Sequence, residues 1–147
     1  MLTTANHIRS LSAAAATLAA LLAPDAGAAT LYERLGGNKI IEQVVSDTID
    51  RTASDPVTRR SFDKVNLANV KKKVVEQICE LASGPCKYSG DSMKLSHQGL
   101  DIREAEFYGM VQHLRDALDR AGVQQSAKNE LLKLLAPMKR DIVTRYS

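Results

Sequence analysis

Residues 101–122, with the sequence DIREAEFYGMVQHLRDALDRAG, have the pattern of a long amphipathic helix. Their apolar side chains recur at intervals of three and four residues, at Phe107, Met110, Val111, Leu114 and Leu118. This spacing places them on one face, because an α-helix completes a turn about every 3.6 residues. Asp101 and Glu104 are spaced as a capping box at the start, and Gly122 is expected to end the helix.

The same spacing predicts three more main helices, over residues 38–53, 66–81 and 126–145, and a short helix over 92–98. Asn38 is expected to cap the first of them, and Asp55-Pro56 and Gly84-Pro85 are expected turns. No stretch alternates apolar and polar residues for long enough to predict a strand. Together these patterns predict a small all-α domain. The side chains expected to be buried in the first and last of these helices are Ile41, Val44, Val45, Thr48, Ile49, Leu131, Leu134, Leu135, Met138 and Ile142.

The N-terminal stretch has the layout of a secretory signal peptide. Residues 11–23, LSAAAATLAALLA, are uncharged and follow Arg9, and they are shorter than the roughly 20 residues of a membrane-spanning helix. Ala26-Gly27-Ala28 then offers a cleavage site with small residues. We therefore expect removal of residues 1–28, export of a domain of residues 29–147 to the bacterial periplasm, and no stable membrane insertion of that domain. An uncleaved amphiphilic anchor is the alternative.

Export changes the interpretation of the two cysteines, Cys79 and Cys86. Two cysteines cannot complete a four-ligand zinc site, and their spacing is not that of a covalent haem attachment motif. In an oxidising compartment they are expected to form a disulfide, worth roughly 2–3 kcal/mol for so short a loop. The alternative is two thiols, with Cys79 packed as a small apolar residue.

Composition and motifs reduce the number of functions that the sequence supports. The net charge of +3 and an aromatic content of 4% without Trp do not favour nucleic-acid binding. The chain lacks a Gly-rich phosphate loop and a pair of histidines or carboxylates with metal-ligand spacing. A bound metal would have to bring most of its own ligands, as the iron of haem does.

His97 suits such a metal. Met93 and Leu100 lie four residues before and three residues after it, so that one imidazole sits on an apolar helical face. An axial ligand of haem iron needs this setting. The alternative is a core histidine that donates to a backbone carbonyl, an interpretation that is stronger still for His113.

Several motifs stand in a fixed order over residues 31–143. They are LYERLGG at 31–37, Phe62 after Arg60-Ser61, Gly84-Pro85, Tyr88-Ser89-Gly90, MKLSHQGLDI at 93–102, Phe107, His113-Leu114 and Leu135-Ala136-Pro137. In this order the set resembles the truncated haemoglobins of group 1, and MKLSHQGLDI is similar to the stretch that holds their proximal histidine. The ordered set is more specific than any single motif in it.

The resemblance implies a two-over-two helical sandwich around haem b, with His97 as the proximal iron ligand and diatomic gases such as O2, CO and NO as partners. It also implies the residues that line the haem, each of which could instead be ordinary core packing. They are Phe62, Val70, Met93, Ile102, Phe107, Met110, Leu114 and Leu135.

The distal side, opposite the proximal histidine, departs from the family's pattern. Many members place a Tyr and a Gln there to donate hydrogen bonds to bound oxygen, whereas this chain has Ile49 and Val74, with Val70 one turn before. Such a hydrogen bond is worth about 1–3 kcal/mol, so its loss should speed oxygen release by roughly 10-fold to 100-fold. Thr48 and Gln77 are nearby polar candidates.

Lys73 matches a position at which family members contact a haem propionate or bind the iron. Three roles remain open for it: a propionate partner, a solvated lysine, and, as a neutral amine, a sixth iron ligand. Ligation carries the cost of desolvating an ammonium.

Together these features predict an exported haem globin that binds diatomic gases reversibly, for oxygen binding and transport or for nitric oxide detoxification. A primary enzymatic role is not expected, although nitric oxide dioxygenase or peroxidase-like side activity stays open. The alternatives are a periplasmic haem redox protein and a haem-free helical interaction module. The expected partners are the gases and a reductase, and the expected state is a monomer or weak dimer.

Overall fold

The computed structural model describes residues 28–145, so that residues 1–27 of the expected leader lie outside the described part. Within residues 28–145 the chain forms helices and a single isolated backbone bridge between Arg103 and Arg145, with no strand. None of the described helices is long and apolar enough to cross a membrane. The helices are α1 (Leu31–Arg34), α2 (Gly37–Ser54), η1 (Arg59–Phe62, 3-10), α3 (Leu67–Leu81), α4 (Met93–Ser96), α5 (Glu104–Arg120), α6 (Gln125–Leu135), η2 (Ala136–Met138, 3-10) and α7 (Lys139–Ile142).

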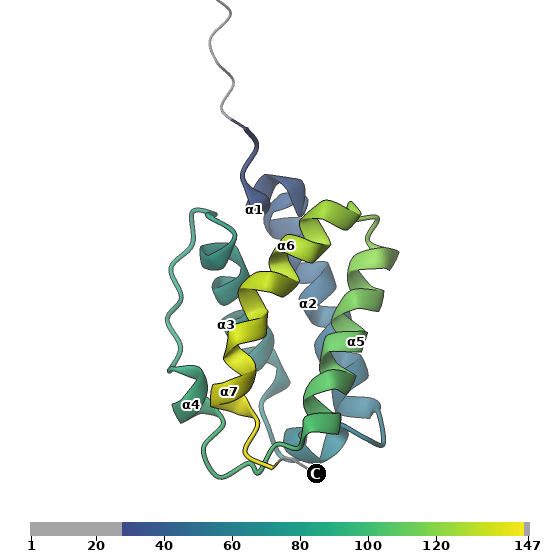
Figure 1. Ribbon diagram of the computed structural model, residues 1–147, viewed down its shortest axis with the longest axis vertical. Coiled ribbons are helices and arrows are strands. Elements are labelled where there is room, and N and C mark those ends of the chain that lie inside the picture. The colour runs from purple at the N-terminus through teal and green to yellow at the C-terminus, as the bar shows by residue number, and fades with distance from the viewer. Residues whose placement is uncertain (1–27, 146–147) are drawn as a thin grey trace, which may run out of the picture.

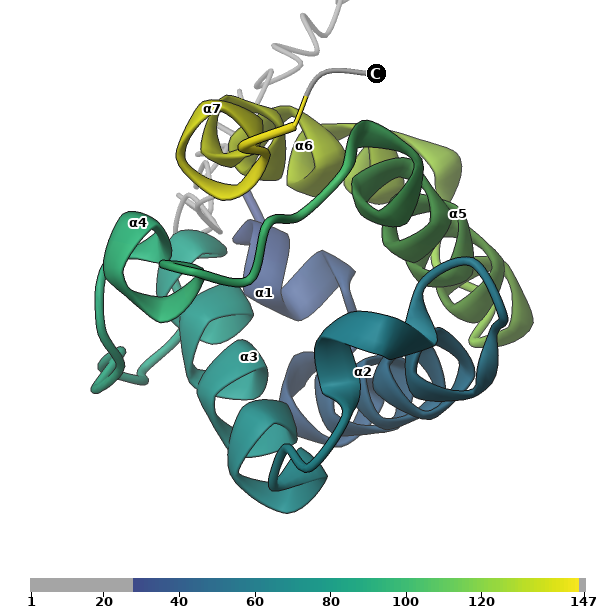
Figure 2. The same ribbon diagram turned by 90° about the horizontal axis from the view of Figure 1, so that it is seen from below.

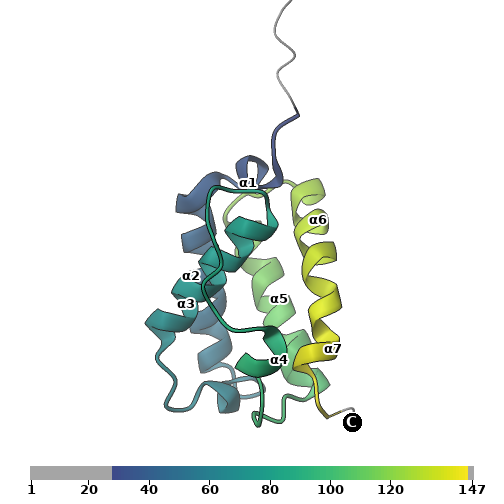
Figure 3. The same cartoon turned by 90° about the vertical axis from the view of Figure 1, so that its left-hand side faces the viewer.

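The helix α2 packs against both α3 and α5 (Figure 1). Seen from below, α2, α3, α4, α7, α6 and α5 follow one another around the molecule, and α1 lies at the far end (Figure 2). The segment between α3 and α4 runs down the outer side of α3 (Figure 3). It leads to α4, which lies beside α7 at the end of the molecule opposite α1 (Figure 1).

The buried core lies toward the α1 end. Its side chains leave a cavity of only about 10 Å³, at or below the size that holds one water molecule. The core residues come from α1, α2, the last turns of α3 and α5, and α6: Leu31, Leu35, Ile41, Val44, Val45, Ile49, Ile78, Ala82, Leu114, Ala117, Leu118, Ala127 and Leu131. By contrast, α4 has no buried residue, and the apolar side chains in the first turns of α3 are only half-buried. The two ends of the molecule are therefore filled to different degrees.

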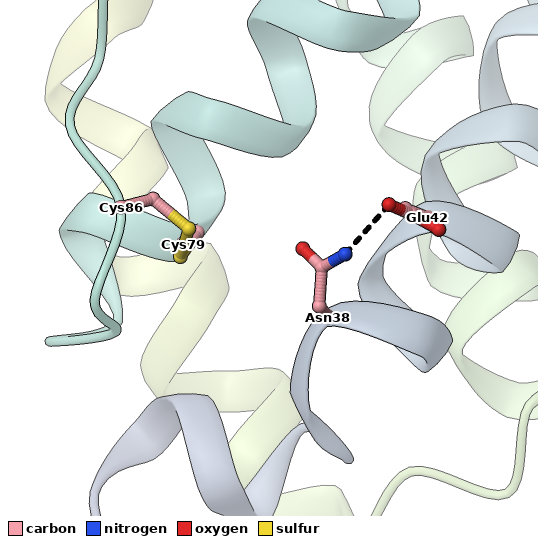
Figure 4. Close-up of a disulfide and its surroundings, with 4 residues drawn as sticks. All are labelled: Asn38, Glu42, Cys79 and Cys86. Carbon is pink, nitrogen blue, oxygen red and sulfur yellow. Dashed lines mark hydrogen bonds between the residues drawn. A yellow bond between two sulfur atoms is a disulfide. The ribbon is translucent and has the colours of Figure 1, made fainter.

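Two predicted helix starts were wrong. Gly36 rather than Asn38 caps α2, with a φ of 95° and a site for a Cβ only 2.6 Å from the Ile40 side chain, so that only glycine fits there. Asn38 lies inside the helix and donates to Glu42 at 2.6 Å (Figure 4).

The start of α5 differs for another reason. Arg103, not Asp101, is its cap, and Glu106 accepts from the Arg103 N–H at 2.8 Å. The preceding Ile102 is 6% exposed, and its carbonyl accepts from the N–H of Thr144 at 3.1 Å. Because this residue pairs with the C-terminal segment, the helix begins after it.

The single helix predicted over residues 126–145 is divided into α6, η2 and α7. Pro137 lies at the break, because proline has no N–H to donate and its ring clashes with the preceding turn. Leu134, expected to be buried, is 37% exposed. The predicted start of α3 near residue 66 is confirmed, and Asn66 caps the helix by accepting from the Asn69 N–H at 3.1 Å.

Candidate functional site

His97 directly follows α4 and is half-buried. Its Nδ1 lies 2.8 Å from the carbonyl oxygen of Met93. A carbonyl can only accept, so Nδ1 carries the proton and donates, which leaves the lone pair on Nε2. This contact is the one expected of a core histidine, but it is also the orientation that metal-binding histidines use. His97 is half-buried at the end of the molecule that has fewer buried side chains. This position favours a role as a metal ligand over that of a core histidine.

The side chains predicted to line a haem fall into two groups. Ile102 and Leu114 are buried, at 6% and 8% exposure. The others are half-buried apolar side chains from η1, α3, α4, α5 and α6: Phe62, Val70, Val74, Met93, Phe107, Met110 and Leu135. Several of them also pack against the core, so core packing alone could account for their partial burial.

These residues fit haem. Half-buried apolar surface at one end of the fold is what a flat, largely apolar group would cover, and a single imidazole supplies an axial ligand. Among the described residues, no three or more His, Cys, Asp or Glu side chains cluster so that they could hold a metal ion by themselves.

The distal position is apolar. Ile49 is fully buried, and Val70 and Val74 of the neighbouring helix α3 are half-buried and pack against the core to which Ile49 belongs. Thr48, one of the polar candidates, donates its hydroxyl proton to the carbonyl of Val44 in its own helix at 2.7 Å. Its proton is thus already used by the backbone, a common state for threonine inside a helix.

Gln77, the other polar candidate, contacts two methionine sulfurs. Its Nε2 lies 3.5 Å from Sδ of Met93 and 3.8 Å from Sδ of Met138. Sulfur is a weak acceptor, so this amide is held only loosely. Met138 was expected only as a core residue of the last helix, and the structure brings it to the site because the break at Pro137 redirects the chain.

Lys73 lies within α3, and its side chain contacts the segment that leads to α4. Its Nζ is 3.2 Å from the carbonyl oxygen of Ser89 and 3.5 Å from Oε2 of Glu76. Ser89 in turn donates its N–H to the same Glu76 carboxylate at 3.2 Å. The hydrogen bond from the Ser89 hydroxyl lowers the pKa of Glu76 below its ordinary value, and the Ser89 N–H and Lys73 contribute to the same shift. Burial of the carboxylate opposes this shift but is outweighed. The three residues tie the loop to α3.

Cys79 and Cys86 form a disulfide, as expected (Figure 4). It joins the end of α3 to the chain just after Gly84-Pro85, and the two Cα atoms are 5.7 Å apart. Cys79 is fully buried, and its carbonyl accepts from the N–H of Gly84 at 2.8 Å. The loop that precedes His97 is therefore anchored at both the disulfide and Ser89.

Sequence reasoning missed the contacts of Arg60. Its guanidinium donates to the Glu106 carboxylate, with Nη2 at 2.8 Å and Nε at 3.1 Å, and to the carbonyls of Leu100 and Asp101. Burial opposes ionisation of Glu106, yet hydrogen bonds from Arg60, Arg103 and Ser61 hold the pKa of Glu106 below its ordinary value. No local spacing signals this pair, because its members lie 46 positions apart.

His113, the other histidine of the described residues, is paired with a carboxylate. Its Nε2 is 2.9 Å from Oδ2 of Asp55, so that it joins α5 to the end of α2. The Val57 N–H first, and His113 after it, lower the pKa of Asp55. This histidine has a structural role, and it serves as a natural control for His97.

Comparison with known proteins agrees with this geometry. Residues 30–144 match the family described as "Bacterial-like globin". The group 1 truncated hemoglobin of Mycolicibacterium paratuberculosis is 35% identical over 79% of this chain and 85% of its own length. That of a Nostoc species is 29% identical over 79% of this chain and 98% of its own.

Solved structures show the same fold. The truncated hemoglobin of Tetrahymena pyriformis, in its Fe(III) form, aligns with a TM-score of 0.75 over 80% of this chain and all of its own, at 23% identity. The 2/2 hemoglobin of a Synechococcus species, which carries covalently attached heme, aligns with a TM-score of 0.73. The all-helical arrangement is thus that of the two-over-two globins, and with its family match over residues 30–144 the chain belongs to the bacterial-like globins.

Proposed function

We propose that this globin binds haem b with His97 as the proximal ligand and takes up diatomic gases reversibly. The observation that carries the proposal is the half-buried His97 imidazole, held through Nδ1 by the Met93 carbonyl at 2.8 Å. When bound, haem supplies an iron that coordinates small ligands such as O2, CO and NO.

His97 provides the orientation. Because Nδ1 donates to Met93, the ring cannot rotate without losing that hydrogen bond, and Nε2 is the atom available to a metal. The apolar side chains predicted to line the haem are mostly half-buried, and with haem bound they would limit the access of water to the iron.

The distal wall supports gas binding over oxygen activation. The side chains of Ile49, Val70 and Val74 have no N–H or O–H to donate. The Thr48 hydroxyl is used within its own helix, and the Gln77 amide contacts the sulfurs of Met93 and Met138. Oxygen in this pocket would therefore be released quickly, which weakens the case for nitric oxide dioxygenation. The same wall lacks an acid or base for peroxide cleavage, so a peroxidase role ranks lower.

We infer that Lys73 is not an iron ligand. Ligation would require loss of its contacts with Ser89 and Glu76 and deprotonation of its amine beside that carboxylate. Its place at the loop leaves a role toward a haem propionate open.

We also propose that the protein is exported after cleavage near Ala28. The apolar stretch of residues 11–23 and the Cys79–Cys86 disulfide support this location, because disulfides persist in oxidising compartments. Mass measurement of the mature N-terminus after expression of the full chain, with fractionation, tests it. Retention of residues 1–28 on a cytoplasmic protein would contradict it.

Absorption spectra test the haem site. The full mature chain, reconstituted with haem, should show a Soret band in the ferric, ferrous and CO-bound forms, and His97→Ala should lose haem readily. His113→Ala is the matched control, because it removes the other histidine of the domain and leaves Met93 and His97 in place. Equal haem retention in His97→Ala and the parent would refute His97 as the proximal ligand. Absence of haem binding in the parent and in both variants would favour the alternative of a haem-free interaction module.

A further inference from the structure

The segment that carries His97 gains little from burial. None of the four residues of α4 is buried, and the residues just after His97, Gln98 and Gly99, are exposed. Such a segment is held by polar contacts at its two ends. Ser89 and the disulfide anchor the chain before α4, and a different set of contacts anchors it after His97.

That second anchor is Arg60. Its Nη1 donates to the carbonyl oxygen of Leu100 at 3.1 Å, and its Nη2 donates to that of Asp101 at 3.0 Å. Between His97 and these carbonyls the backbone turns through Gly99, with φ of 77°, and the N–H of Leu100 returns to the His97 carbonyl at 3.2 Å. Arg60 therefore holds the far side of a turn that begins at His97.

The guanidinium is itself fixed in direction by Glu106. Nε and Nη2 contact the two oxygens of that carboxylate, which is only 6% exposed and also accepts from the Ser61 hydroxyl and the Arg103 N–H. A planar fork with several donors can meet one carboxylate and two carbonyls together, and a lysine cannot. Arg60 therefore fixes the turn after His97 relative to α5, the helix that carries Glu106.

We propose that Arg60, backed by Glu106, is a positioning residue for the proximal histidine, and that it sets the tilt of the His97 ring toward haem iron. The inference rests on the proposed function of His97. Arg60 also lies two residues before Phe62 in η1, so that one short helix supplies both this anchor and a candidate haem wall.

Arg60→Gln and Arg60→Lys test the proposal, with Arg59→Gln, at the exposed neighbouring position, as control. In the ferrous ligand-free protein, the iron–histidine stretching band measured by resonance Raman should shift and broaden in Arg60→Gln. Haem loss should be faster by roughly 10-fold to 100-fold, the usual cost of removing a residue that orients a metal ligand. Arg60→Lys should fall between Arg60→Gln and the parent, and Arg59→Gln should match the parent.

A merely structural role would lower stability without moving the band. Urea unfolding and amide hydrogen exchange of the haem-free protein are therefore measured on the same variants. The proposal expects faster exchange at residues 97–101 in Arg60→Gln, out of proportion to any loss of global stability. An unchanged band in a folded Arg60→Gln protein, while His97→Ala loses haem, would overturn it and leave the proposed function intact. If His97→Ala retains haem, both proposals fall.

Discussion

The side-chain amine of Lys73 lies 3.2 Å from the carbonyl oxygen of Ser89. This contact joins α3 to the loop that leads to His97, and the Glu76 carboxylate completes it by binding both residues. It favours a lysine that holds the outer loop over one that turns inward to bind iron.

Replacement of Lys73 by alanine should therefore leave the coordination of the haem iron unchanged. Because both members of the Lys73–Glu76 pair are partly exposed, the free energy of unfolding should fall by only about 0–1 kcal/mol. Ferric and ferrous absorption spectra check the first expectation and urea unfolding the second, with Lys72→Ala at the exposed neighbour as control. Conversion of a six-coordinate low-spin spectrum to a five-coordinate one in Lys73→Ala alone would show that the lysine is a ligand.

The sequence predicted the long helices because their signals are local. Asn66 caps α3 where its side chain can reach the N–H three residues on, and Gly122, with a φ of 72°, ends α5. Pro137 was available as a signal in the last helix and should have divided it. Asp101 misled because Ile102 pairs with the C-terminal segment, a contact that no local pattern shows.

The site divides in the same way. His97 and Met93 lie one helical turn apart, so their contact follows from spacing, as the disulfide follows from the closeness of two cysteines in the chain. Arg60 and Glu106 lie 46 positions apart, and Gln77 and Met138 lie 61 apart. Such pairs depend on how the helices pack, and one sequence carries no direct signal for them.

Glu106 should make stability depend on pH. Its pKa is lower in the folded protein than its ordinary value of 4.5, so the stability that it contributes is present above that value and is lost as pH falls through the folded pKa. Urea unfolding of the haem-free protein at a series of pH values between about 3 and 7 should show a shallower acid limb in Glu106→Gln. Exposed Glu42 provides the control substitution Glu42→Gln, and equal acid limbs in parent and Glu106→Gln would contradict the expectation.

Loss of the disulfide should destabilise the domain by about 2–3 kcal/mol, because it closes a short loop at the end of α3. Urea unfolding of Cys79→Ser plus Cys86→Ser, and of the parent with and without reductant, measures this. The parent should respond to reductant and the double variant should not. A parent whose stability is the same in both conditions would show that the bond contributes nothing.

A hydrogen-bond donor introduced on the distal wall should slow the release of oxygen. Val74 is half-buried on α3, one turn from Val70, and packs against the core to which Ile49 belongs, so we expect glutamine at this position to place an N–H beside a bound gas. One such hydrogen bond is worth about 1–3 kcal/mol, which corresponds to dissociation slower by roughly 10-fold to 100-fold in Val74→Gln. Stopped-flow displacement of oxygen by CO measures the rate.

Val74→Leu keeps the wall apolar and controls for side-chain size, so it should release oxygen nearly as fast as the parent. CO forms weaker hydrogen bonds than oxygen, so its dissociation should change less. If Val74→Gln and Val74→Leu release oxygen at the same rate, the position does not face the bound gas and the assignment of the distal wall is wrong.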